Sequence, residues 1–294
     1  MPVFEAAYRT WQGERRSGWH RLWAFPKFTF LQLSGKRSVQ MVFVLAWLPF
    51  LAFLTFIYVS VNEKLTTEVL RLPRNILPPV DGAFFTAFVF CQLPFLFFFT
   101  LLMGPGLIAT DLRHQALPMI LSKPISRWQY LFGKFSVLFI LLSALSWLPA
   151  TILFAAQTAA VPAAHPWRVR FWSESLWLWP RTVALCLIVV VTLNLLVLMF
   201  SSLTQNSRFA GVALIMFIVG SVVVAPIATG IFGSERWMSL SPVANLITVA
   251  GLLLESGLKV QSPPLLAWGY FVLLWATCLI VLSRRVRAFH LFRE

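Results

Sequence analysis

Residues 111–134 read DLRHQALPMILSKPISRWQYLFGK, and this polar stretch separates two long apolar runs. Asp111 and Arg113 open it, a short apolar segment follows over 116–121, and Lys-Pro, Ser-Arg and Gly-Lys pairs complete it. Polar residues between two long apolar runs are typical of a loop beside a membrane. Because the loop contains its own apolar segment, we expect a short helix within it. We expect this helix to be a docking site for a binding partner.

The composition of the whole chain predicts an integral membrane protein. Of its 294 residues, 59% are hydrophobic and 12% are charged, and the mean hydropathy is +0.80. Soluble domains have about 25% charged residues. The formal net charge of +14 could indicate nucleic-acid binding, but basic residues also collect in the cytoplasmic loops of membrane proteins. We therefore expect a lipid membrane as partner and no nucleic acid.

Six apolar runs are long enough to cross a bilayer, which needs about 20 apolar residues. They cover residues 38–61, 82–110, 131–160, 179–203, 209–230 and 263–283. The predicted fold is therefore an all-α integral membrane domain of six transmembrane helices over 38–283. A cytoplasmic segment over 1–37 precedes it, and a basic cytoplasmic tail over 284–294 follows it.

The distribution of Lys and Arg predicts the orientation. With six spans both termini lie on one side, and the segments on that side hold 16 of the 24 basic residues. Basic residues favour the cytoplasmic side. The sequence thus predicts a multi-pass protein of the inner (plasma) membrane with both termini in the cytoplasm, which also places residues 111–134 there.

Two shorter helices are expected at the membrane surfaces. Over 17–37, Trp19, Leu22, Trp23 and Phe30 share one helical face and basic residues supply the other, which is typical of an interfacial elbow helix. A disordered basic tail is the alternative. Residues 231–262 are rich in apolar side chains, and their Ser-Pro pair suits a helix start. We expect a short helix there, at or dipping into the outer membrane face.

The second run contains Pro94 and the triplet Gly104-Pro105-Gly106. Proline removes a backbone donor and bends a helix, and glycine permits close helix contact. The triplet is either a packing kink or a hinge that moves during function.

Catalytic chemistry has little support in this sequence. It contains no P-loop, HExxH, CxxC or GxSxG pattern, and no Asp, Glu, Lys or Arg at the centres of the spans. Asp111 and His114 could share a metal at helical spacing, but two ligands make a weak site, and we predict neither a metal site nor an enzyme. Gln92 and Asn194 are polar residues within spans, so they either hydrogen-bond neighbouring helices or line a substrate path.

The string GLIATDLRHQALPMILSKPISRWQYLFGKF, from Gly106 to Phe135, resembles the second-to-third span region of permeases of the type-2 ABC exporter superfamily. The resemblance rests on Asp111 after a small-residue stretch, on a Ser-x-Pro-x-x-Arg segment formed by Ser122, Pro124 and Arg127, and on Gly133-Lys134. The family's Gly-Thr after the acid is replaced by Gln115-Ala116.

This resemblance implies a working complex of two permease chains, either a homodimer or a pair with a paralogue, and two ATP-binding subunits. ATP and Mg would bind to those partner subunits, and this chain would bind no cofactor. A short cytoplasmic coupling helix, about 112–121, would sit in a groove on the ATPase, with Asp111 near its start. The residues implied in coupling are Asp111, Arg113, His114, Gln115, Ser122, Lys123, Pro124 and Arg127, while Lys134 would meet ATPase carboxylates or lipid phosphates.

Other functions remain open on the sequence. The same fold could transmit ATP-driven motion to an outer partner while transporting little. A membrane scaffold or assembly factor without an ATPase, and a polytopic membrane enzyme, belong to different classes. The substrate is not readable from the residues.

Overall fold

The computed structural model describes residues 35, 37–62, 80–115, 127–160 and 176–288, and the regular structure in these ranges is helical. Six helical segments in them are long and apolar enough to cross a membrane, and they lie where the six apolar runs predicted them. These segments are Arg37–Val61, Gly82–Arg113, Trp128–Ala159, Leu178–Leu203, Ser207–Phe232 and Pro264–Arg285.

The first three spans are each built from two helices in succession. The first comprises α2 (Arg37–Leu45) and α3 (Leu48–Val61), the second α4 (Gly82–Met103) and α5 (Gly106–Arg113), and the third α7 (Arg127–Leu145) and α8 (Trp147–Ala160). Prolines lie at or close to each break, and a proline cannot donate the backbone hydrogen bond that would continue the helix.

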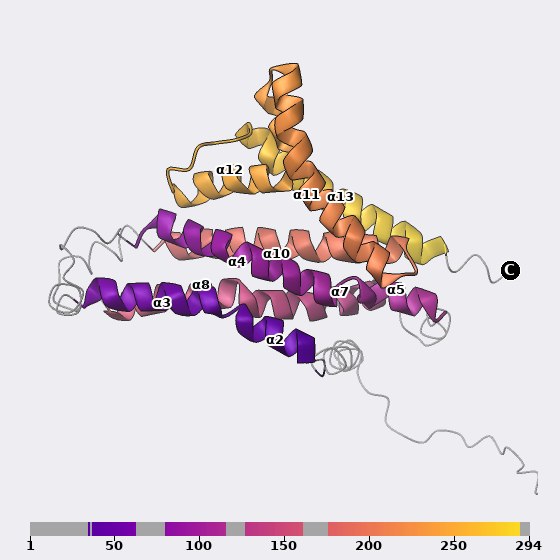
Figure 1. The fold of residues 1–294 in the computed structure, drawn as a ribbon, viewed down its shortest axis with the longest axis horizontal. Helices are drawn as coiled ribbons and strands as arrows, with labels where there is room; N and C mark the ends of the chain where they lie inside the picture. The colour runs from indigo at the N-terminus through magenta and orange to yellow at the C-terminus, as the bar shows by residue number, and fades with distance from the viewer. Residues whose placement is uncertain (1–34, 36, 63–79, 116–126, 161–175, 289–294) are drawn as a thin grey trace, which may run out of the picture.

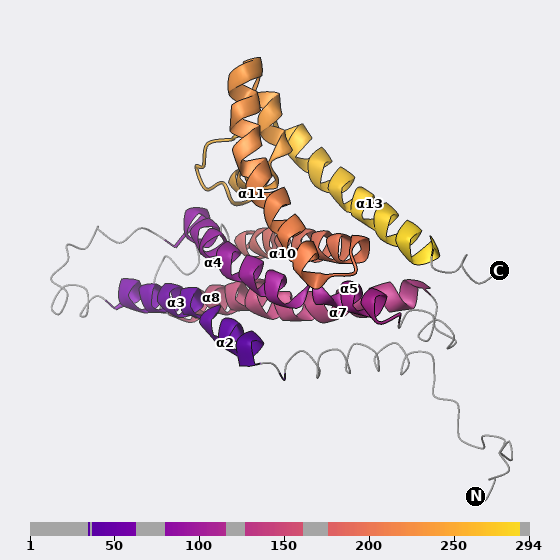
Figure 2. The same cartoon turned by 45° about the vertical axis from the view of Figure 1, so that its right-hand side comes forward.

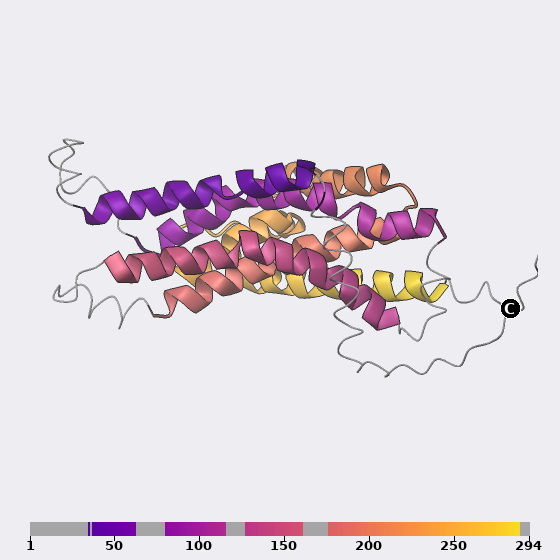
Figure 3. The same cartoon turned by 90° about the horizontal axis from the view of Figure 1, so that it is seen from below.

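The later spans are single helices, and α10 (Leu178–Leu203) lies at the centre of the bundle. It packs against α4, α5, α7, α8, α11 (Ser207–Phe232), α12 (Pro242–Leu254) and α13 (Pro264–Ala288). Figures 1 and 3 show α10 running along the long axis of the bundle between the other helices. Because it is apolar on all sides and buried over most of its length, α10 is the core onto which the site is assembled.

The helices at the edge of the bundle leave much of their apolar surface exposed. Many large side chains of α11 are exposed, as are several of α2, α3 and α13. Figure 2 shows α11 and α13 diverging from the layer that contains α3, α4 and α10. Exposed apolar side chains along helices of spanning length match a lipid solvent.

The short helix expected before the last span is α12, preceded by the 3-10 turn η2 (Glu235–Leu240). Ser241 is its N-cap and accepts from the Ala244 amide at 3.4 Å, with Pro242 in the first turn, as the sequence predicted. Figures 1 and 3 show that α12 lies along α10 and not across the ends of the other helices. The expected short helix is therefore present and packs on α10 and α13, and its position at or in the outer membrane face stays a prediction.

A buried polar cluster holds α12 in this position. Asn245 donates to the Ser239 carbonyl oxygen at 2.7 Å and accepts from the Ser262 hydroxyl at 2.8 Å. The Thr248 hydroxyl oxygen accepts from the backbone amides of Gln261 and Ser262 at 3.2 and 3.1 Å. At its other end, Leu254 lies against Gly82, where an added Cβ would stand 1.8 Å from the Leu254 carbonyl oxygen.

Some predicted segments lie wholly or mostly outside the described residues. The elbow helix over 17–37 is one, and the final tail beyond residue 288 is another. In the described part, Figure 1 shows α3 and α8 ending at the left of the bundle and α5 and α13 ending at the right.

Candidate functional site

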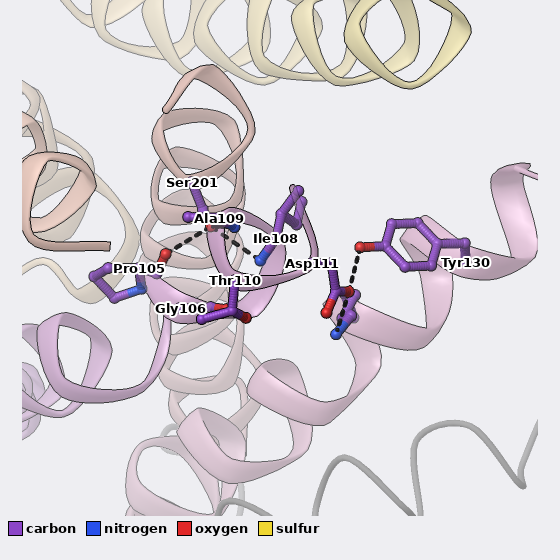
Figure 4. A network of polar contacts seen from close by, with 9 residues as sticks. Pro105, Gly106, Ile108, Ala109, Thr110, Asp111, Tyr130 and Ser201 are labelled. Atoms are coloured by element: carbon purple, nitrogen blue, oxygen red, sulfur yellow. Dashed lines mark hydrogen bonds and ion pairs between the residues drawn. The ribbon is translucent and has the colours of Figure 1, made fainter. Parts of the chain in front are cut away.

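The candidate site is the junction of α4, α5, α7 and α10, where the polar stretch begins. The break between α4 and α5 falls at Gly104-Pro105 and not at Pro94, which lies inside α4. The hydroxyl group of Ser201 in α10 spans this break. It donates to the Pro105 carbonyl oxygen at 2.8 Å and accepts from the backbone amides of Ile108 and Ala109 at 3.0 and 2.9 Å (Figure 4).

Ser201 therefore caps α5 from another helix. The first amides of a helix have no partner within the helix, and Pro105 at the N-cap of α5 has no side chain that could accept from them. Ser201, which is fully buried, supplies the missing acceptor. No local pattern around Ser201 indicates this role, because its partners are more than 90 residues away in sequence.

Helices α4 and α10 can approach each other closely because residue 104 is glycine. A Cβ at Gly104 would lie 2.4 and 2.6 Å from the two methyl carbons of Val197. Real Cβ atoms do not make contacts this short, so the approach of α4 to α10 depends on glycine here.

Asp111 joins α5 to α7. Its Oδ2 atom lies 2.9 Å from Lys134 Nζ and accepts from the Tyr130 hydroxyl at 2.7 Å (Figure 4). The Lys134 side chain is 9% exposed and that of Asp111 19%. Coulomb attraction is strong at such a partly desolvated position, so the two ends of the 111–134 stretch are held together.

This geometry corrects two expectations about the same residues. Asp111 lies in the last turn of α5 and not in the first turn of a helix, so the dipole of α5 does not favour its charge. The ammonium group of Lys134 offsets that unfavourable position. Lys134 was expected to meet a partner or a lipid phosphate, whereas in the structure it pairs with Asp111.

The predicted coupling helix does not begin at residue 112. α5 ends at Arg113, and Gln115 has a left-handed backbone with φ 51°, which a continuing helix would not allow. Arg113, His114 and Gln115 are exposed at this end. Residues 116–126, with Ser122, Lys123 and Pro124, lie outside the described residues, and Arg127 is placed only as the first residue of α7.

Gln92 and Asn194 both hydrogen-bond neighbouring helices. Gln92 Nε2 donates to the carbonyl oxygens of Ala46 and Leu145, each at 2.8 Å, and Asn194 Nδ2 donates to the Phe135 carbonyl oxygen at 2.9 Å. These contacts agree with the helix-contact alternative of the sequence analysis. A role in a substrate path remains a prediction.

Gln92 joins two helix breaks that carry the same local sequence. Residues 45–49 read LAWLP and residues 145–149 read LSWLP. Pro149 has no amide to donate to the Leu145 carbonyl, four residues before it, and Gln92 supplies that donor. This repeat was a usable sequence signal for the two breaks, although it could not reveal their common partner.

The described residues contain no group of three or more His, Cys, Asp or Glu that could hold a metal ion. The weak metal pair considered from sequence, Asp111 and His114, has its carboxylate engaged by Lys134 and Tyr130. In the described part of the chain, the Asp111 carboxylate therefore links α5 to α7.

No protein-family model matches the chain, and a comparison with curated proteins finds no match. The resemblance to type-2 exporter permeases therefore depends on the residues between Gly106 and Phe135 and on the predicted arrangement of six spans, and it stays a prediction.

Proposed function

We propose that this chain is the membrane-spanning permease subunit of an ATP-driven ABC transporter, an exporter whose ATP is hydrolysed by a separate subunit. Six apolar helices of spanning length and the type-2 exporter-like segment from Gly106 to Phe135 support this proposal. The proposed location is the inner (plasma) membrane with both termini in the cytoplasm. A second permease copy or a paralogue would complete the membrane domain.

The observation that carries the proposal is the double attachment of α5. Ser201 fixes its first turn to α10, and Lys134 and Tyr130 fix its last turn to α7. A push on residues 116–126 would therefore reach the central helix and the third span together. A loosely attached loop would absorb the same displacement without moving the spans.

The exposed end of α5 offers a surface for the ATP-binding partner. Arg113 and His114 lie there, beside the anchored Asp111. In this arrangement Asp111 contributes by holding α5, and Arg113 is the residue available to meet an acidic surface of the ATPase. Residues 122–124 and Arg127 complete the proposed contact on sequence grounds.

Purification of the tagged full chain from its native cells in mild detergent tests this function. We expect an ATP-binding subunit to be recovered with it and the complex to hydrolyse ATP. Substituting Arg113→Glu should lower the recovered ATP-binding subunit several-fold, because a like charge then faces an acidic surface. The matched control is Arg236→Glu, an exposed arginine in η2.

Recovery of no ATP-binding subunit with the unsubstituted chain would overturn the proposal and favour a scaffold. Equal losses for Arg113→Glu and Arg236→Glu would show that the end of α5 is not the contact. The mechanotransmission alternative predicts the same ATPase together with a stably bound protein on the outer side.

A further inference from the structure

A cavity of about 770 Å³ lies between α2, α4, α5, α7 and α11. Its volume falls within the range of roughly 300–1,000 Å³ that small-molecule sites occupy. We call it the α5–α11 cavity. The lining residues on which the argument rests are Leu102, Leu107, His114, Arg208, Val212 and Ile215, together with the Asp111–Lys134 pair.

The two main walls of the cavity are formed by α5 and α11. On each helix the lining residues share one face, which is apolar at one end and polar at the other. On α5 this face begins at Leu107 and reaches Asp111 and His114 after one and two turns. On α11 it begins at Arg208 and continues through Val212 to Ile215 at the spacing of one helical face.

The two polar ends lie at the same end of the cavity. Figure 1 shows α5 ending, and α11 beginning, toward the right of the bundle. Gly211 packs on Pro105, whose ring carbon would lie 3.5 Å from an added Cβ, so the helices meet just beyond Arg208. One end of the cavity is therefore polar and the other apolar.

The polar end favours an anion. Asp111 and Lys134 neutralise each other at 2.9 Å, which leaves the guanidinium group of Arg208 as the uncompensated charge on the wall. No hydrogen bond or ion pair joins that guanidinium group to another residue in the described ranges. Guanidinium groups bind phosphate with two parallel hydrogen bonds, and the exposed His114 imidazole can add a donor.

The apolar end is accessible from the surrounding lipid. Leu102 is 44% exposed, Val212 54% and Ile215 38%, although all three line the cavity. An alkyl chain could thus lie against these side chains while its polar group reached Arg208. A soluble anion would leave this wall without a partner.

We propose that the α5–α11 cavity binds an anionic phospholipid, with its phosphate group at Arg208 and an acyl chain against Val212 and Ile215. This site goes beyond the proposed permease function and does not depend on an ATPase partner. A free phosphate compound shares the headgroup chemistry but not the chain, so the two sources can be separated.

Binding of labelled phosphatidylglycerol to the purified full chain in detergent tests the proposal. We expect phosphatidylglycerol to bind saturably. Phosphatidylcholine and inorganic phosphate should be poor competitors of this binding. Arg208→Gln should weaken it about tenfold through loss of charge-assisted hydrogen bonds. Val212→Trp should weaken it by filling the apolar end. The matched controls, Arg236→Gln and Val223→Trp, change exposed residues away from the cavity and should leave binding unchanged.

Equal competition by phosphatidylcholine would refute the anionic headgroup, and equal competition by inorganic phosphate would refute the acyl chain. Unchanged affinity in both Arg208→Gln and Val212→Trp would place the lipid elsewhere. Arg208→Lys provides a check on folding, since it keeps the charge and should retain part of the affinity.

Discussion

Single polar side chains hold the candidate site together, and each does so across the bundle. Ser201 makes three hydrogen bonds at the α4–α5 break. One carboxylate oxygen of Asp111 pairs with the Lys134 ammonium group and accepts a hydrogen bond from the Tyr130 hydroxyl. Because the surroundings are apolar, each of these groups is costly to leave without its partner.

Replacement of Ser201 by alanine should destabilise the protein by about 1–3 kcal/mol, because the amides of Ile108 and Ala109 would lose their buried acceptor. Reversible denaturation in mixed detergent micelles would measure the free energy of unfolding. Ser221→Ala is the control, since Ser221 donates only to a carbonyl oxygen of its own helix. Equal losses for the two variants would contradict a capping role for Ser201.

Removal of the Lys134 charge, as in Lys134→Met, should destabilise the fold by about 2 kcal/mol. This is below the roughly 3–5 kcal/mol expected for a fully buried pair, because Asp111 is partly exposed and keeps its Tyr130 hydrogen bond. The double variant Asp111→Asn/Lys134→Met should be more stable than the sum of the single losses predicts. Denaturation of the unsubstituted protein, the two single variants Asp111→Asn and Lys134→Met, and the double variant gives the coupling energy between the two residues. Strictly additive losses of stability would contradict a direct pair.

At the scale of elements, breaks in helices determine how the spans fit together. Gln92 ties the α2–α3 and α7–α8 breaks to α4, and Ser201 ties the α4–α5 break to α10. Carbonyl groups and amides freed at a break must be satisfied internally when lipid surrounds the helix. The breaks are thus also the places at which helices are joined.

Gly104→Ala should force α4 away from α10 and lower stability, because the new Cβ would overlap Val197. We expect a loss of about 1–3 kcal/mol, the usual cost of overpacking, and partial recovery in Gly104→Ala/Val197→Ala. Gly220→Ala is the control. A Cβ at Gly220 meets nothing within 4 Å, so alanine there should be neutral or slightly stabilising. A neutral Gly104→Ala would show that the helices separate without cost.

At the scale of the whole molecule, α10 is surrounded by other helices while α11 and α13 present apolar surface outward. The exposed apolar residues match a lipid environment. The salt bridge between Arg181 and Glu255, at 2.7 Å, joins the first turn of α10 to the end of α12. Its residues are exposed, so it contributes little to stability.

The charge distribution predicts which end faces the cytoplasm. With the three native cysteines replaced, Arg113→Cys should react with a membrane-impermeant maleimide only after cells are permeabilised, whereas Lys259→Cys should react in intact cells. Both positions are exposed in the structure. Quantifying the labelled protein in each condition checks the orientation, and the reverse pattern would place the end of α5 outside.

The sequence by itself determined six apolar helices of spanning length, the start of α12 at Ser241-Pro242 and a helix break at the Gly104-Pro105-Gly106 triplet. These features depend on apolar length, capping chemistry and proline geometry, which are local properties of the chain. Only the tertiary structure decided that Asp111 pairs with Lys134, that Ser201 caps α5, that Gln92 joins two breaks and that α12 lies along α10. Those pairings join residues on different helices, and in a bundle of uniformly apolar spans the pattern of one helix does not specify its neighbour.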